Sequence, residues 1–215
     1  KKPEINYKIW ENVDFKINKN VIEGFSNRGL LKVKKNKNLK IPSEHNGIKL
    51  TQIADDAFRN INFRNESLKK YDLESVTLPN SIEKIGNFAF QSNYITELDV
   101  QDCENLTEIG KGAFMNNKIS TLNLNDHLKL IDDAAFHINN LEFVFIPKNV
   151  EKIGISAFRN NKINMLLMNS EKLSEIGEMA FLGNAIAQVD LTQTPNLKTI
   201  GVQAFAGNLI TSVNL

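Results

Sequence analysis

Hydrophobic positions recur along this chain at a nearly constant interval of more than twenty residues. The clearest marker begins with Ile and ends with Ala-Phe, as in the segment Ile-Gly-Lys-Gly-Ala-Phe at 109–114. A period of this length is typical of a solenoid, in which each coil covers the next. The marker occurs seven times, and its Phe residues are 32, 24, 22, 22, 23 and 24 residues apart: Phe58, Phe90, Phe114, Phe136, Phe158, Phe181 and Phe205. The one long interval predicts an insertion near residues 60–72.

Every repeat has the same seven apolar positions, and their spacing predicts local structure. The last two positions are separated by one residue, which predicts a short strand whose neighbouring side chains face opposite ways. The Ala-Phe pair is expected to end a tight helical or 3₁₀ turn. Stacked coils would superpose these positions into continuous apolar rows. In the third repeat the positions are Leu106, Ile109, Ala113, Phe114, Ile119, Leu122 and Leu124.

Two further rows are interpreted structurally. An Asn lies three residues after six of the seven Phe residues, where a short amide can satisfy the backbone groups of a loop. A Gly follows the marker Ile in five repeats and suggests a left-handed backbone turn. These rows are Asn93, Asn117, Asn139, Asn161, Asn184 and Asn208, and Gly86, Gly110, Gly154, Gly177 and Gly201.

Residues 1–40 lie outside the repeat and are expected to form a β-rich cap over the first coil. The segments 15–17, 21–22, 30–33 and 39–41 have an extended pattern, so we expect residues 30–33 to be a strand. The repeat domain would cover residues 41–215. The chain does not begin with Met and stops after a predicted strand, so we expect a fragment or processed chain. Further repeats could follow residue 215, or another chain could cover that edge.

Composition excludes several classes of protein. The chain has 215 residues, of which 41% are hydrophobic, and a formal net charge of +1. Its longest runs of large apolar residues, 143–146 and 165–168, are far shorter than the roughly 20 residues of a membrane-spanning helix. One Cys, Cys103, and three His residues do not suffice for an intrachain disulfide, a thiolate cluster or a zinc site. No cofactor is expected.

The outward positions of the predicted strands indicate a candidate binding face. They contain no Lys or Arg, which makes nucleic-acid binding by this face improbable. Phe143, Phe145, Met165 and Leu167 would form a two-by-two apolar block on adjacent strands, with Glu97, Asp99 and Asp190 as an acidic rim. A partner protein or self-association would explain the block. The alternatives are that another part of the molecule covers it, or that it has no role.

A basic segment competes as a second site. Its cationic residues are Arg28, Lys32, Lys34, Lys35, Lys37 and Lys40, and residues 24–43 contain no Asp or Glu. On a strand, alternation would place several of these side chains on one face. These side chains could simply form a solvated surface, which is the usual role of such a segment. The more specific alternative is that they contact a polyanion.

The sequence contains no recognisable set of catalytic residues, so we do not expect an enzyme. The chain has no Gly-rich phosphate loop, no His-Glu-x-x-His motif, and no Ser or Cys with an evident His partner. Asp132, Asp133 and His137 come close together in one repeat, but the two Asp residues occupy the turn after the Ile. We interpret them as solvated turn residues.

The repeat resembles the BspA-like, or treponemal, leucine-rich repeat family. Residues 78–90, Leu-Pro-Asn-Ser-Ile-Glu-Lys-Ile-Gly-Asn-Phe-Ala-Phe, and residues 146–158 match its unit closely. Members commonly have Cys where this chain has the Asn row, which suggests a surface protein that avoids cysteine. The resemblance implies a right-handed, curved leucine-rich repeat solenoid of α/β type, with short parallel strands and short helical or 3₁₀ turns. It supplies no catalytic residue.

The resemblance also implies a function and a location. We expect a secreted or cell-surface adhesin domain that binds a host extracellular or matrix protein, and a Gram-positive bacterium is favoured as its source. Two alternatives stay open: an accessory recognition domain of a larger secreted enzyme such as a peptidase, and a self-associating surface spacer. Homo-association would use the apolar block or the C-terminal edge.

Overall fold

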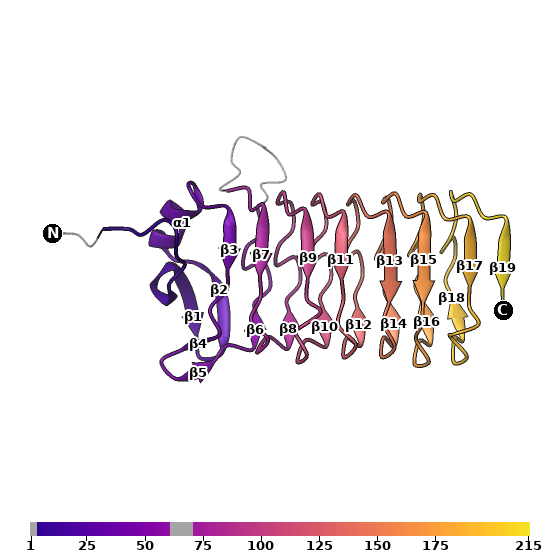
Figure 1. The fold of residues 1–215 in the computed structure, drawn as a ribbon, viewed down its shortest axis with the longest axis horizontal. Helices are drawn as coiled ribbons and strands as arrows, with labels where there is room; N and C mark the ends of the chain where they lie inside the picture. Colours follow the sequence, from indigo (N-terminus) through magenta and orange to yellow (C-terminus); the bar gives the residue numbers. More distant parts are fainter. Residues whose placement is uncertain (1–3, 61–70) are drawn as a thin grey trace.

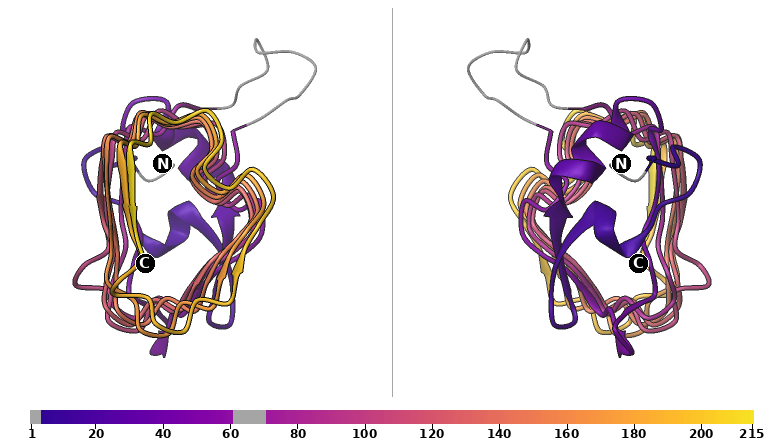
Figure 2. Two further views of the ribbon diagram at one scale, coloured as in Figure 1. Left: turned by 90° about the vertical axis from the view of Figure 1, so that its right-hand side faces the viewer. Right: turned by 90° about the vertical axis from the view of Figure 1, so that its left-hand side faces the viewer.

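The computed structural model describes residues 4–60 and 71–215, which form one continuous solenoid with a cap at its N-terminal end (Figure 1). Each coil contributes a strand to two rows that lie on opposite sides of the coil (Figure 2). The predicted insertion, including Phe63, lies largely outside the described residues.

The first row is a nine-stranded sheet, parallel except for its first pair, built on the marker Ile. The extended cap segments 15–17 and 21–22 were predicted and are strands here, but the sequence did not predict the two-residue strands of the repeats, which are too short to show alternation. Its order along the solenoid is β1 (Phe15–Asn18), β2 (Val21–Phe25), β6 (Gln52–Ile53), β8 (Lys84–Ile85), β10 (Glu108–Ile109), β12 (Leu130–Ile131), β14 (Lys152–Ile153), β16 (Glu175–Ile176) and β18 (Thr199–Ile200).

The second row, called here the strand face, contains the strands that the alternation predicted. Its strands pair two by two, in parallel and in register, as Leu98 does with Leu122, and so form four two-stranded sheets. Both rows have one strand per coil, and the solenoid curves only slightly (Figure 1). The row consists of β3 (Asn38–Lys40), β7 (Ser75–Thr77), β9 (Glu97–Asp99), β11 (Thr121–Asn123), β13 (Phe143–Ile146), β15 (Met165–Met168), β17 (Gln188–Asp190) and β19 (Ser212–Asn214).

The predicted apolar rows fill the space between the two rows of strands. Successive rings of the marker Phe residues stack with centroids 5.1–5.7 Å apart and planes within 17° of each other. The first six rings are fully buried, and Phe205 in the last coil is partly buried. The Ala-Phe segments are hydrogen-bonded turns, without helix.

The Asn row is structural, as predicted. Asn117 Nδ2 donates to the carbonyl oxygens of Phe90 and Phe114 at 2.9 and 3.1 Å, and its Oδ1 accepts from the backbone N–H of Ile95 at 3.1 Å. The other Asn residues make the same bonds in their coils. Each amide therefore joins consecutive coils.

The Gly row has a different cause from the one expected. None of these Gly residues has a positive φ; the left-handed residue comes two positions later, as at Phe88 (φ 56°). A Cβ on Gly86 would lie 2.5 Å from the backbone of Asp55, and one on Gly177 would lie 2.5 Å from that of Gly154. The prediction of a left-handed turn at these Gly residues is wrong, because close approach of the preceding coil selects them.

The cap continues both rows instead of forming a separate sheet. Ile22 of β2 pairs with Ile53, and Leu39 of β3 pairs with Val76, each in the register of the repeats. Phe25 packs edge-on against Phe58 at 4.8 Å. The cap also contains the 3₁₀-helix η1 (Asn12–Asp14). After the cap, β4 (Glu44–His45) and β5 (Ile48–Lys49) form a small antiparallel hairpin.

The expected strand at residues 30–33 is wrong, because this segment belongs to the helix α1 (Asn27–Val33). Ser26 caps its N-terminus: Ser26 Oγ accepts a hydrogen bond from the backbone N–H of Gly29 at 3.2 Å. Gly29, Lys32 and Val33 face inward at helical spacing.

Candidate partner-binding face

The apolar block lies in the middle of the strand face. β13 and β15 pair in parallel with Phe143 opposite Met165 and Phe145 opposite Leu167. Phe143 is 43% exposed, Phe145 37%, Met165 54% and Leu167 47%. The described residues therefore leave the block uncovered, and its four side chains form one contiguous surface.

The exposure of the block follows from the alternation of its strands. Val144 and Ile146 of β13 and Leu166 and Met168 of β15 fill the core, so the residues between them point outward. A shift by one residue would bury the block but expose those core side chains. The fold therefore sets the direction of these side chains without requiring that they be apolar.

The acidic rim flanks the block unevenly. Asp190 lies on β17, next to β15, whereas Glu97 and Asp99 lie on β9, two strands from β13. The Thr192 hydroxyl and backbone N–H donate to Asp190 Oδ1 at 2.7 and 2.9 Å. These bonds hold the pKa of the Asp190 carboxyl below its usual range, so it is charged at neutral pH.

A hollow of about 450 Å³ adjoins the block on the side of β11. Phe143 and Phe145 line one part of it, and Glu104, Asp126 and His127 line another. The sequence did not indicate the two acidic residues, because they come from loops whose position beside β13 depends on how the coils stack. Asp126 forms an ion pair with Lys148 at 3.2 Å, so Glu104 is the freer of the two carboxylates.

Comparison with known families identifies the repeat. The model of the BspA type leucine rich repeat region matches six copies, over residues 61–186 and 166–215. The chain belongs to the BspA-type leucine-rich repeat family. No curated protein matches the sequence.

Solved bacterial structures share the fold of this chain. A leucine rich cell surface protein from Faecalibacterium prausnitzii A2-165 has a TM-score of 0.68 at 21% identity, over 95% of this chain and 53% of that one. A leucine-rich repeat protein from Bacteroides ovatus ATCC 8483 gives 0.68 at 18%, over 96% and 52%. The pneumococcal vaccine antigen PcpA gives 0.52 at 17%, over 96% and 69%. The chain thus spans about half the length of the first two proteins.

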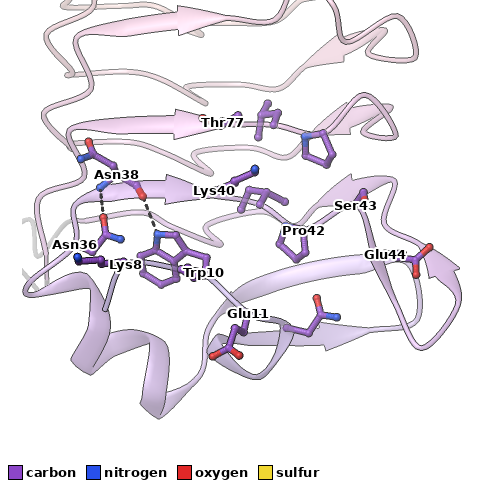
Figure 3. Close-up of a pocket in the computed structure, with 15 residues that line it drawn as sticks. Lys8, Trp10, Glu11, Asn36, Asn38, Lys40, Pro42, Ser43, Glu44 and Thr77 are labelled. Atoms are coloured by element: carbon purple, nitrogen blue, oxygen red, sulfur yellow. Dashed lines mark hydrogen bonds between the residues drawn. The ribbon is translucent and has the colours of Figure 1, made fainter. Parts of the chain in front are cut away.

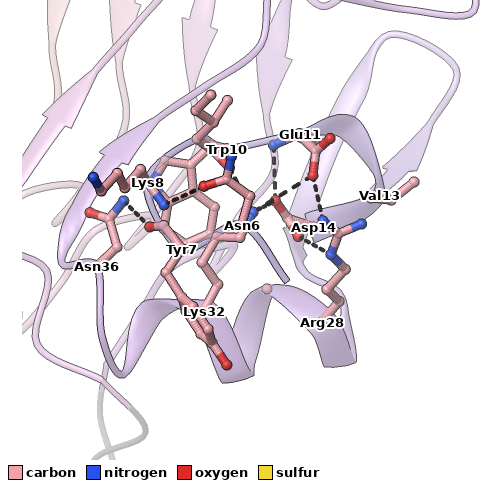
Figure 4. Close-up of polar contacts among 12 residues, drawn as sticks. Asn6, Tyr7, Lys8, Trp10, Glu11, Val13, Asp14, Arg28, Lys32 and Asn36 are labelled. Carbon is pink, nitrogen blue, oxygen red and sulfur yellow. Dashed lines mark hydrogen bonds and ion pairs between the residues drawn. The ribbon is translucent and has the colours of Figure 1, made fainter. Parts of the chain in front are cut away.

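The basic segment of this BspA-type chain does not form one cationic surface. Lys32 is fully buried and forms an ion pair with Asp14, and Arg28 forms ion pairs with Asp14 and Glu11 (Figure 4). The interpretation of Lys32 as a polyanion contact is therefore wrong. Its ammonium group also donates to the Ile9 carbonyl at 2.7 Å, so it joins residues 4–11, called here the N-terminal arm, to α1.

The remaining basic side chains of the segment are dispersed. Lys37 forms an ion pair with Glu74 at 3.6 Å, and Lys35 Nζ lies 4.4 Å from the ring centre of Tyr7. Lys34 and Lys40 are exposed, on α1's C-terminal side and on β3 respectively. Lys34 belongs to the end of a helix and Lys40 to a strand, so these cations do not alternate along one strand as predicted.

The residues considered for catalysis have structural roles in the BspA-type coils. Burial, followed by the charges of Asp102 and Asp99, raises the pKa of the Cys103 thiol, which disfavours the thiolate. Asp133 Oδ1 accepts from the backbone N–H of Ile155 at 2.7 Å, and His137 Nδ1 lies 3.0 Å from the Arg159 carbonyl oxygen. Within residues 4–60 and 71–215, no cluster of three His, Cys, Asp or Glu side chains is arranged to hold a metal.

The described part of the chain contains no helix of membrane-spanning length, since α1 has seven residues.

Proposed function

We propose that this BspA-type domain is a non-catalytic protein-binding module of a secreted or cell-surface bacterial protein. The exposed apolar block on β13 and β15 is the observation that supports this proposal most directly. Large apolar side chains at four adjoining outward positions form a patch of a few hundred Å², the size at which surface patches are often functional. The Gram-positive source and adhesion to a host belong to the same proposal.

The partner we propose is an extracellular or matrix protein that presents an apolar patch with Lys or Arg around it. Aromatic and Met side chains are typical anchors at the centre of an interface. Asp190 lies on the strand next to the block, Glu97 and Asp99 lie two strands away on its other side, and Glu104 lines the hollow beside it. Positive charge on the partner would complement this rim and accelerate association.

The test is binding of the purified domain to a panel of immobilised extracellular-matrix and serum proteins. We expect Phe145→Asp to weaken binding at least about tenfold, because an interface anchor contributes on the order of 2 kcal/mol. Thr121→Asp is the matched control, since it adds the same charge at an exposed position of β11. Binding should also weaken as salt is raised. Equal binding by both folded variants would refute the block as the contact site.

Self-association is the second candidate, and it uses the same block. The exposed apolar side chains of the last coil, among them Leu209 and Val213, also support it. Light scattering against protein concentration distinguishes the two candidates: an apparent mass that grows in the wild type but not in Phe145→Asp would favour a second copy as the partner. The accessory domain of a larger enzyme remains an alternative, which the full-length sequence would decide.

A further inference from the structure

A second hollow lies at the cap end of the strand face and has no role in the proposed protein contact. It is a groove of about 890 Å³ between the N-terminal arm and the strands β3 and β7 (Figure 3). This volume falls within the range of about 300–1,000 Å³ that is usual for ligand sites. Its apolar lining comes from Trp10, Ile41, Pro42, Leu78 and Pro79.

The walls of the groove are held in place by the cap. Trp10 Nε1 donates to the Asn38 carbonyl at 2.7 Å, and the indole stacks on Phe25 at 5.4 Å. Asn36 Nδ2 donates to the Tyr7 carbonyl at 2.8 Å, which ties the arm to the segment before β3. A preformed site loses little conformational entropy when a ligand binds.

The polar groups of the groove suit a neutral ligand with many hydroxyl groups. Its lining contains two cationic side chains, Lys8 and Lys40, and two anionic ones, Glu11 and Glu44, of which Glu11 also pairs with Arg28. The rest of its polar lining is neutral amide and hydroxyl groups, which both donate and accept hydrogen bonds. The buried Oδ1 of Asn12 has no hydrogen-bond partner in the described chain. The neutral polar residues are Asn12, Asn36, Asn38, Ser43 and Thr77.

The geometry is less suited to a peptide. An extended peptide would add to the free edge of β3 through backbone hydrogen bonds. At that edge the Asn38 N–H already donates to Asn36 Oδ1 at 3.1 Å, and the Asn38 carbonyl accepts from Trp10. Pro42, farther along the edge, has no N–H. Strand addition is therefore largely blocked.

We propose that the cap groove binds a neutral oligosaccharide. The C–H faces of pyranose rings would pack on Trp10 and the Pro and Leu side chains, while the ring hydroxyls would bond to the Asn, Ser and Thr side chains. This site is separate from the apolar block, so the proposal does not depend on the proposed protein contact.

Trp10 is the chain's single Trp, so its fluorescence reports on this groove alone. The experiment titrates the full chain with cello-, laminari-, chito- and manno-hexaoses, and calorimetry measures the same mixtures. We expect at least one sugar to change the Trp10 emission saturably. Thr77→Arg, at an exposed position of β7 that lines the groove, should weaken that binding at least tenfold. Thr121→Arg on β11 should leave it unchanged.

Three results would overturn the proposal. One is the absence of a saturable signal from every sugar at 10 mM by both methods. Another is equal binding by the wild type and a folded Thr77→Arg variant. The third is a response to extended Pro-rich peptides with none to any sugar, which would make the groove a peptide site.

Discussion

At the scale of single residues, the coils depend on two left-handed positions. One lies three residues after the marker Ile and the other two residues after the Phe, and both have φ between 54° and 71° in the second to seventh repeats. The left-handed backbone turns each N–H toward the next coil, as when Ile138 donates to the Arg159 carbonyl at 3.0 Å. Gly occupies these rows only at Gly112, Gly183 and Gly207, so most coils accept a strained residue.

Ile138 is the least suitable residue for this conformation, because it is β-branched and has φ of 57°. The left-handed region costs most residues about 1–2 kcal/mol, and Asn tolerates it best after Gly. We therefore expect Ile138→Asn to raise the free energy of unfolding by about 1 kcal/mol, as measured by urea denaturation. Asn116 and Asn160 already occupy the same position in the neighbouring coils.

Ile155→Asn is the control for this prediction. Ile155 is also an exposed Ile in a turn, but its φ is not positive. Its replacement should change stability by less than about 0.5 kcal/mol. If the two variants shift the urea midpoint equally, the effect comes from replacing an exposed apolar side chain with a polar one, and not from relief of backbone strain.

At the scale of the turn, the Asn row makes each coil depend on its neighbour. Asn139 donates to the carbonyls of Phe114 and Phe136 at 2.9 and 3.2 Å and accepts from the N–H of Ile119 at 3.0 Å. All three partners are buried. A buried group that loses its hydrogen bond costs about 1–3 kcal/mol, which is more than the bond itself contributes.

We expect Asn139→Ala to lower the free energy of unfolding by on the order of 3 kcal/mol, because it leaves two carbonyls and one N–H without a partner. Thermal and urea denaturation measure the change. Asn140→Ala is the control, since the neighbouring Asn140 side chain makes no hydrogen bond with the described residues. A loss below 1 kcal/mol at Asn139 would mean that water replaces the amide.

The cap is a modified coil at this same scale. Its helix brings Lys32 to Asp14, and the two buried charges are satisfied by each other and by the Ile9 carbonyl. The sequence showed a row of cations without showing which one was internal. That distinction required the position of Asp14, which lies 18 residues earlier in the chain.

At the scale of the whole molecule, stability should vary along the axis. An inner coil is covered on two sides, whereas the last coil has one neighbour and leaves Val213 53% exposed. In a solenoid each coil is stabilised mainly by the coils beside it. The described cap covers the other end with β2 and β3, so the two ends differ.

We expect amide hydrogen exchange in this 215-residue chain to follow that order. Amides of β10, β12 and β14 should exchange slowest, and those of β17 to β19 should exchange faster because the last coil opens by local unfolding. Mass spectrometry of peptic fragments measures both regions in one sample. Uniform protection from β10 to β19 would mean that the chain unfolds only as a single unit.

The sequence by itself determined the repeat, its apolar rows, the outward direction of Phe143 and Phe145, and the role of the Asn row. These follow from periodicity, because the same local spacing of residues recurs in seven repeats and can be recognised in the sequence. Tertiary structure alone decided the nine-stranded sheet, the reason for the Gly row, the burial of Lys32 and the two hollows. Each of these depends on backbone or side chains that meet across coils, and the distance between such groups is not encoded in the spacing of any one segment.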